Sequence, residues 1–200
     1  MENIKLLGKW DTSSIAVKDR GLQKYISLKP VLIPRTFGRH ASQQFHKSYI
    51  NIVERFINHI FVPGHRGKKH LLTSGQTSGK TFTAIKLLEK TFKIIEERTK
   101  KNPVEVLVSA VENAALREEI TSFQVGGIIV RKAVITAPQR RVDMAIRLIV
   151  QGAYQRSFGK PKKFHETLAE ELLGAYNYDP QSSSSIREKE RIEREAAGAR

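Results

Sequence analysis

Apolar residues recur with a helical spacing through most of this chain from residue 49 onward, which limits the fold to one built mainly of helices. The spacing is interrupted between about residues 117 and 136, where Gly126-Gly127 separates two stretches rich in Ile, Val, Thr and Phe. A Gly-Gly pair flanked by β-branched residues is typical of a tight β-hairpin turn. The pattern therefore predicts a mainly α fold, a bundle of about six helices with a protruding β-hairpin arm.

The individual helices are predicted from their apolar stripes and end signals. One begins near Tyr49 and stops at Pro63-Gly64, and others cover about residues 80–99, 139–157 and from 164 onward. Asn102 is suited to cap a further helix that has Pro103 in its first turn. The expected buried side chains are Ile50, Val53, Ile57, Ile60 and Phe61, then Phe82, Ile85, Leu88, Phe92 and Ile95, then Val104, Leu107, Val108, Val111 and Ala115, then Val142, Ala145, Ile146, Ile149 and Ala153, and finally Leu168, Leu172 and Tyr176.

The two terminal segments are predicted to differ from the bundle domain, which we assign to residues 49–180. Residues 1–48 show little periodicity, and the prolines and basic residues of "LKPVLIPRTFGRH" favour an extended basic N-terminal arm. Residues 181–200 follow a serine-rich break and alternate in charge, which favours a charged tail or surface helix that orders on binding. We expect both terminal segments to be largely mobile without a partner.

Positive charge is concentrated in two blocks of the sequence. The chain has a net charge of +15, and residues 29–80 and 131–163 each contain nine Lys/Arg against one acid, Glu54 in the first and Asp143 in the second. Each basic window is thus net +8, and the remainder of the chain is close to neutral. Such clustering favours a polyanion, above all nucleic acid, as the partner, with a soluble basic domain as the plain alternative.

Composition excludes several other classes of protein. The chain has no cysteine, which rules out disulfides and cysteine-bearing zinc sites. The N-terminus shows no signal-peptide pattern, and no segment approaches the roughly 20 apolar residues that span a bilayer, so we expect a soluble intracellular protein without membrane contact. The first window is rich in histidine but lacks the converging cysteines or carboxylates of a metal site, so we expect no metal and no cofactor.

The segment "SGQTSGKT" at residues 74–81 resembles the phosphate-binding loop of nucleotide hydrolases only in part. That loop requires a glycine at position 74, where this chain has Ser74, and a buried strand before it, where this chain has polar residues. A basic loop that precedes the next helix and contacts RNA phosphates is the better interpretation, with a nucleotide hydrolase as the alternative. The adjacent acid pairs Glu118-Glu119 and Glu170-Glu171 point to different faces and are interpreted as solvated, so no catalytic set is expected.

The second window predicts a helix that is apolar on one face and rich in arginine on the other. Arg140, Arg141 and Arg147 lie opposite the apolar stripe, and Arg156 follows in the same helix. Arginine suits a phosphate backbone because its planar fork donates two hydrogen bonds at once. The aromatic residues Phe37, Phe45, Tyr154 and Phe158 are suited to stack on unpaired bases. A DNA-binding helical regulator remains an alternative to an RNA-binding protein.

Several long segments together resemble a known family. They are "NPVEVLVSAVENAALREE", "QVGGIIVRKAVITAPQRRVDMAIRLIVQGA" and "LAEELLGAYN", and, upstream, "GKWDTSSIAVKDRGLQKYISLKPVLIPRTFGRHA" and "NIVERFINHIF". In family order they resemble the universal small-subunit ribosomal protein seven, and the upstream segments resemble its archaeal-type members. The resemblance implies a non-enzymatic, cytoplasmic ribosomal protein that binds the 3′ major domain of small-subunit ribosomal RNA (rRNA) and nucleates assembly of the head. It also implies a hairpin side that faces the exit tRNA and mRNA, with head and platform proteins as neighbours.

The resemblance and the charge pattern together give the candidate RNA contacts. The family's Gly-Lys motif falls on Gly79 and Lys80, although Thr81 stands where a second basic residue is usual. Arg131 and Lys132 match the second hairpin strand, and Arg140 and Arg141 match the paired arginines after the hairpin proline. Charge alone adds Arg35, Arg39, Lys68, Lys69, Arg147, Arg156, Lys160, Lys162 and Lys163.

Overall fold

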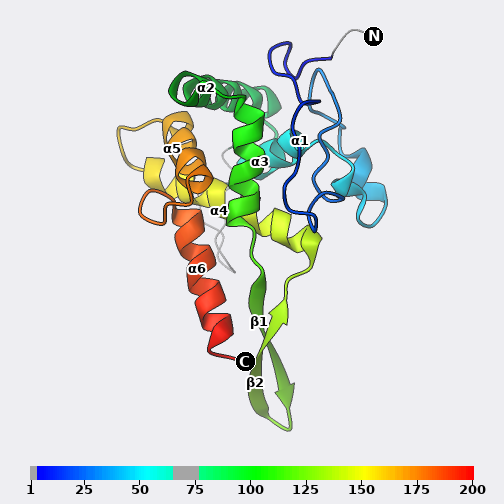
Figure 1. The fold of residues 1–200 in the computed structure, drawn as a ribbon, viewed down its shortest axis with the longest axis vertical. Coiled ribbons are helices and arrows are strands. Elements are labelled where there is room, and N and C mark those ends of the chain that lie inside the picture. The colour runs from blue at the N-terminus through cyan, green and yellow to red at the C-terminus, as the bar shows by residue number, and fades with distance from the viewer. Residues whose placement is uncertain (1–3, 65–76) are drawn as a thin grey trace.

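The computed structural model describes residues 4–64 and 77–200, and within them the predicted mainly α fold is confirmed. Six α-helices and one antiparallel hairpin follow two short 3-10 helices (Figure 1). Their bounds are η1 Arg39–Ser42, η2 His46–Ser48, α1 Ile52–Ile60, α2 Thr81–Thr99, α3 Pro103–Ala114, β1 Glu118–Val125, β2 Ile128–Ile135, α4 Pro138–Ser157, α5 Phe164–Tyr176 and α6 Ser184–Ala197.

Three helices begin at a polar side chain that caps their first turn. The side chains of Asn51 and Asn102 accept hydrogen bonds from the backbone N–H groups of Val53 and Val104, at 2.9 and 3.0 Å. Ser183 caps α6 in the same way. These bonds satisfy N–H groups that have no partner within the helix, and the cap predicted at Asn102 is confirmed.

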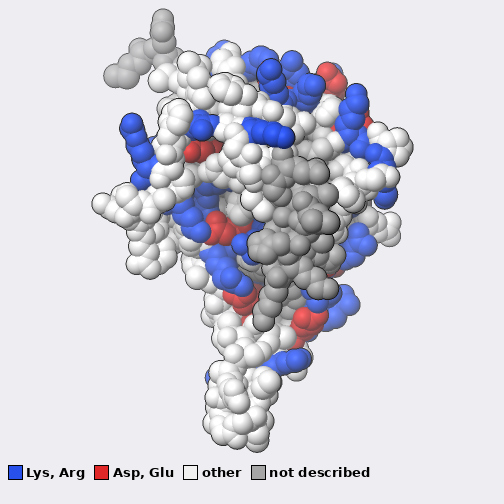
Figure 2. Space-filling model, turned by 180° about the vertical axis from the view of Figure 1, so that it is seen from behind, with Lys and Arg blue, Asp and Glu red and all other residues white. Residues whose placement is uncertain are grey.

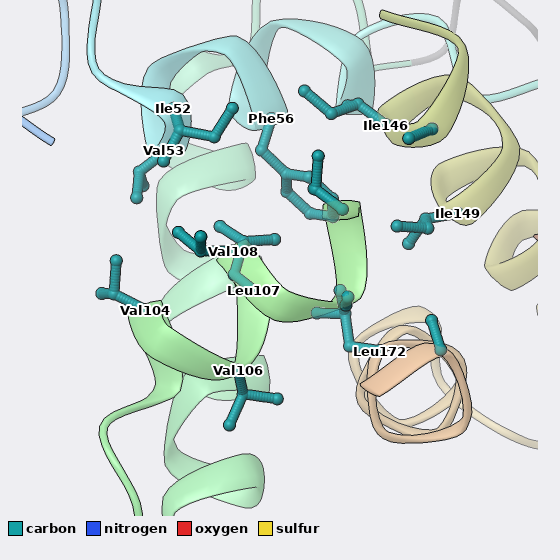
Figure 3. Packing of buried hydrophobic residues seen from close by; sticks show 14 of the residues in the cluster. Ile52, Val53, Phe56, Val104, Val106, Leu107, Val108, Ile146, Ile149 and Leu172 are labelled. Atoms are coloured by element: carbon teal, nitrogen blue, oxygen red, sulfur yellow. The ribbon is translucent and has the colours of Figure 1, made fainter. Parts of the chain in front are cut away.

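Helix α3 is the centre of the bundle. Its side chains are buried nearly all round, including Val104, Val106, Leu107 and Val108, and a helix that is apolar on all sides belongs inside a core. Figure 3 shows Leu107 and Val108 on the side of α3 that faces Phe56 of α1. The same buried cluster includes Ile52, Val53 and Phe56 of α1, Ile146 and Ile149 of α4, and Leu172 of α5.

The buried face of α2 differs from the prediction most at Phe82, and Ile85 is only half-buried. Phe82 is 82% exposed, whereas Ala84, Leu88 and Phe92 are buried. Thr81 and Ala84 in the same turn are buried, whereas Phe82 lies about 120° round the helix from Leu88 and therefore faces solvent, off the buried stripe.

The hairpin projects away from the bundle (Figure 1). Its strands pair from Glu118 with Ile135 to Val125 with Ile128, so only Gly126 and Gly127 form the turn. Both glycines have positive φ values, 55° and 87°, which a two-residue turn of this hand requires and which side chains disfavour. The predicted hairpin and its turn are therefore confirmed.

Helix α6 packs against the bundle instead of forming a separate surface helix. Ile186 and Ala196 are fully buried, and the buried Lys189 donates a 2.6 Å hydrogen bond to the carbonyl of Asn113. Its C-terminal end lies beside the hairpin (Figure 1), where the N–H of Ala133 donates to the carbonyl of Ala199 at 3.3 Å. The serine run that predicted a flexible break instead holds α6 in place.

Residues 4–51 follow an irregular path beside the helices, and the expected extended arm is not shown. Leu6, Trp10, Leu22 and Ile26 are buried within the core. The Trp10 ring packs edge-on against Phe92 with 5.2 Å between centroids, and its indole N–H donates to Glu96 at 3.0 Å. Large apolar side chains spaced along the segment therefore fix it to the bundle. Among the described helices none is long and apolar enough to cross a membrane.

Candidate nucleic-acid interface

The acid of each basic window points into the protein, although the windows are basic outside. Glu54 is 5% exposed and accepts hydrogen bonds from the backbone N–H and the hydroxyl of Thr36, at 2.8 and 2.7 Å. Asp143 accepts from the buried Arg55 at 2.8 Å and pairs with Lys47. Neither carboxylate therefore neutralises the outward-facing cations of its window.

Asp143 also brings the two windows together in space. It belongs to the second window, and both of its cationic partners belong to the first. Burial by itself raises the pKa of Asp143, but the hydrogen bonds from Lys47 and Arg55 outweigh burial and hold that pKa below its usual value. The two blocks of charge thus form adjoining parts of one molecular surface.

Lys80 is exposed at the start of α2. It follows Gly79, whose φ of +74° favours glycine, and the Thr77 hydroxyl ties this turn to α1 by donating to the carbonyl of Ile60 at 2.8 Å. The element before it, in the described residues, is the helix α1, and the only described strands form the antiparallel hairpin. A phosphate-binding loop of a nucleotide hydrolase instead follows a buried strand of a parallel sheet. The predicted contacts Lys68 and Lys69 lie outside the described residues.

Arg131 and Lys132 are both exposed on β2 and, as neighbours in a strand, point to opposite faces. Beyond them residues 120–130 carry no charge, and Figure 2 shows the far end of the hairpin free of Lys and Arg. Exposed apolar side chains there include Phe123, Val125, Ile128, Ile129 and Val130. The cationic side chains of the hairpin are therefore confined to the part nearer the bundle.

Arg140 and Arg141 are adjacent in sequence but make different contacts. Arg140 forms a two-pronged pair with Glu119 of β1, at 2.6 and 2.7 Å, which raises the pKa of the arginine while about half of its side chain stays exposed. Arg141 is mostly buried and donates to the carbonyl of Leu116 at 2.9 Å and to Asp19 at 2.8 Å. Arg140 thus holds the hairpin to α4, whereas Arg141 holds the N-terminal segment to α4.

The remaining cations of the second window also divide into two groups. Arg156 reaches the buried Glu171 at 3.2 Å, and Lys162 pairs with Glu170 at 2.9 Å. Arg147, Lys160 and Lys163 are exposed. In the first window Arg35 and Arg39 are exposed, and the guanidinium of Arg35 lies 4.7 Å from the ring centroid of Phe37.

The interpretation of Glu171 as a solvated acid is wrong. Its side chain is fully buried and accepts hydrogen bonds from the N–H groups of Ser184 and Ser185 and from the hydroxyl of Ser183. A carboxylate at a helix N-terminus satisfies its unpaired N–H groups and complements the helix dipole. Glu171 thus anchors α6 to α5, and the serine-rich stretch supplies the donors.

His59 lies close to Asp143 and its two cationic neighbours, and its protonation state follows from that position. Burial is the main cause that lowers the pKa of His59 to about 4. The negative charge of Asp143 raises this pKa, whereas the positive charges of Arg147 and Arg55 lower it further. The ring is therefore neutral at pH 7. Among the residues that the structure describes, no group of three His, Asp or Glu side chains converges as a metal site.

A basic helical bundle whose two basic windows expose most of their cations, while the one acid of each window bonds to the protein's own groups, is typical of proteins that bind nucleic acid through the phosphate backbone. Comparison with known proteins specifies the class further. Residues 22–200 match the family described as ribosomal protein S7p/S5e, and the chain belongs to this family.

The relatives cover almost the whole chain. It is 48% identical to the small ribosomal subunit protein uS7 of Nanoarchaeum equitans over 197 residues, which are 98% of this chain and 99% of the relative. It is 45% identical to the protein of the same name from Methanococcoides burtonii, with 98% and 99% covered. For the protein from Methanothrix thermoacetophila the identity is 44%, with 98% and 100% covered. These archaeal relatives agree with the archaeal-type family predicted from the sequence.

Proposed function

We propose that this protein is a structural component of the small ribosomal subunit that binds rRNA through the surface formed by its two basic windows. Membership of a ribosomal protein family gives the chain a structural role and not an enzymatic one. The observation that supports RNA binding best is the inward orientation of Glu54 and Asp143. Because each bonds to the protein's own groups, the neighbouring cations are left to neutralise phosphates.

The finer proposal names the RNA region and its surroundings. We propose that the bound RNA is the 3′ major domain, that binding nucleates assembly of the head, and that the hairpin side faces the exit tRNA and mRNA. The resemblance of the sequence to the family supports these three statements. The uncharged far half of the hairpin further suggests contact with riboses or bases there, since phosphate contact needs cations.

The exposed cations are the proposed phosphate contacts. They are Lys80, Arg131, Lys132, Arg147, Lys160, Lys163, Arg35 and Arg39. Arg140 joins them in this proposal because about half of its side chain remains exposed beside Glu119. Lys162 joins them on the same ground, because 58% of its side chain stays exposed beside Glu170. Arg141 and Arg156 are mostly buried and bond within the protein, and we assign these two to support of the surface.

Salt-dependent binding tests the proposal. The affinity of the protein for a transcript of the 3′ major domain is measured between low and physiological salt, beside another rRNA domain and a duplex DNA of equal length. We expect the 3′ major domain to bind most tightly, with a log–log slope of roughly 0.7–0.9 per phosphate contact. Equal affinity for the duplex DNA would favour a DNA-binding protein, and a preference for the other rRNA domain would overturn only the named region.

A further inference from the structure

A cavity of about 530 Å³ lies between the N-terminal segment and the start of α1. Its lining residues come from segments 29–40 and 46–54, and the second segment includes the start of α1. Its volume falls within the range of roughly 300–1,000 Å³ that is usual for small-ligand sites. The side chains that carry our argument are Lys29, Arg35, Phe37, Arg39, His46 and Tyr49.

Aromatic rings line this cavity while remaining open to solvent. Phe37 is 78% exposed and Tyr49 is 63% exposed. The ring of His46 packs edge-on against that of Tyr49, with 5.5 Å between their centroids. This contact restricts the orientation of the Tyr49 ring. Exposed rings beside a cavity do not contribute to the core, but they offer flat faces on which a base can stack.

The backbone holds one of these rings in a disfavoured conformation. Phe37 has a φ of 53°, in the left-handed region that is disfavoured for a residue with a side chain. Thr36, immediately before it, is fixed by its two hydrogen bonds to Glu54. Such conformations persist where surrounding contacts impose them, and they cluster at binding sites. The protein thus presents the Phe37 ring to solvent at a cost in stability.

Positive charge accompanies each ring. The guanidinium of Arg35 lies 4.7 Å from the centroid of Phe37, and the ammonium of Lys29 lies 5.9 Å from that of Tyr49. Arg39 is a third exposed cation at the cavity. The acid at the cavity, Glu54, is buried and bonded to Thr36, so it does not offset these charges at the surface. Rings next to cations match a ligand that has both a flat base and an anionic phosphate.

We propose that this cavity binds one unpaired nucleotide of the rRNA. Its base stacks on Phe37 or Tyr49, and its flanking phosphates contact Lys29, Arg35 and Arg39. The inference rests on the proposed function for the identity of the RNA and adds a site at which a base is held out of the helical stack. A base that is already unpaired suits the site because no pairing energy is lost on binding.

Substitution of the rings tests the stacking separately from the charge. The variants are Phe37→Leu, which keeps an apolar side chain at the strained position, and Tyr49→Leu, with Phe82→Leu as a matched control because Phe82 is equally exposed outside the cavity. For the 3′ major domain transcript we expect each cavity variant to raise the Kd about tenfold, within the range for loss of one stacked base. The salt slope should not change because no cation is removed, whereas Lys29→Gln with Arg35→Gln should reduce it.

Crosslinking provides a second readout that does not depend on any variant. The wild-type protein is irradiated with a transcript that contains 5-iodouridine, and the crosslinked peptides are identified by mass spectrometry. We expect a crosslink at Phe37 or Tyr49 to a uridine in or beside a single-stranded region. Unchanged Kd values in both cavity variants, without a crosslink in residues 29–49, would overturn the cavity proposal while rRNA binding stands. Failure of the wild-type protein to prefer the transcript would overturn the proposed function itself.

Discussion

Single residues in this protein show that a cation's neighbours decide whether it is available for RNA. Arg141 and Arg147 lie on the same helix and have the same side chain, yet their surroundings differ. Arg141 is mostly buried and donates to Leu116 and Asp19, whereas Arg147 is exposed. Burial alone raises the pKa of Asp19, but the hydrogen bond from Arg141 helps to hold it below its usual value.

We predict opposite effects for these two arginines. Arg141→Gln should reduce the free energy of unfolding by about 2 kcal/mol, because charged hydrogen bonds to Asp19 and Leu116 are lost, and should leave the salt slope of RNA binding nearly unchanged. Arg147→Gln should leave stability unchanged and reduce the slope by roughly 0.7–0.9. Urea denaturation and salt titration of both variants measure this. A stable Arg141→Gln protein with a reduced slope would contradict the assignment.

His59 predicts a dependence of stability on pH. Its pKa is about 4 in the folded protein, below the usual 6.5, so between those values the unfolded chain binds a proton that the folded chain does not. This contribution to stability is therefore complete above pH 6.5 and is lost as the pH falls toward 4. We expect a loss of roughly 2–3 kcal/mol from this residue.

The measurement compares wild type with His59→Asn by urea denaturation from pH 7 to pH 4. Carboxylates titrate in both proteins, so the difference between the two curves isolates His59. The variant should lose less stability than wild type on acidification. Parallel curves would show that His59 has the same pKa in the folded and unfolded protein.

At the scale of secondary-structure elements, α6 joins the bundle through a close contact with α4. Helix α4 approaches α6 at Gly152, where an added Cβ atom would lie 1.9 Å from the Ser184 hydroxyl oxygen and 3.2 Å from the carboxyl carbon of Glu171. Glycine is thus required there by close approach rather than by its backbone conformation. The same point joins the start of α6 to the buried carboxylate that caps it.

We predict that Gly152→Ala destabilises the protein by about 1–3 kcal/mol because of overpacking. Ser184→Ala should restore part of that loss, since it removes the oxygen that the new methyl group meets, and its own effect is measured alone. A double-mutant cycle in urea gives the coupling between the two sites. Additive losses would show that Ser184 is not the obstructing group.

At the scale of the whole molecule, Asp143 links the two basic windows and thereby unites the charged surface. Asp143→Asn should destabilise the protein by about 3 kcal/mol at pH 7, because it leaves the buried Arg55 without its anionic partner. The pKa of Asp143 is held below its usual value, so wild type keeps this stability above the unfolded-state pKa and loses it as the pH falls through the folded-state pKa. The gap between the proteins should therefore narrow in acid. Denaturation at pH 7 and near pH 3 measures it, and a constant gap would contradict the role of the charge.

Short sequence patterns were sufficient to predict the elements whose conformation depends on interactions between neighbouring residues. The Asn102-Pro103 start of α3 and the Gly126-Gly127 turn follow from capping and turn chemistry within a few residues. Burial was predicted less well at Phe82, because an apolar side chain is not always buried and this one lies off the stripe formed by Ala84, Leu88 and Phe92.

The sequence by itself determined the helical class, the hairpin, the two basic windows and the family. Only the tertiary structure decided which charged side chains form ion pairs and hydrogen bonds within the protein. Arg141 bonds to Asp19 across 122 positions of the chain, and Glu171 collects donors from the start of α6 while pairing with Arg156. No spacing rule connects such partners, because ion pairs and caps between distant segments exist only after the core has brought those segments together.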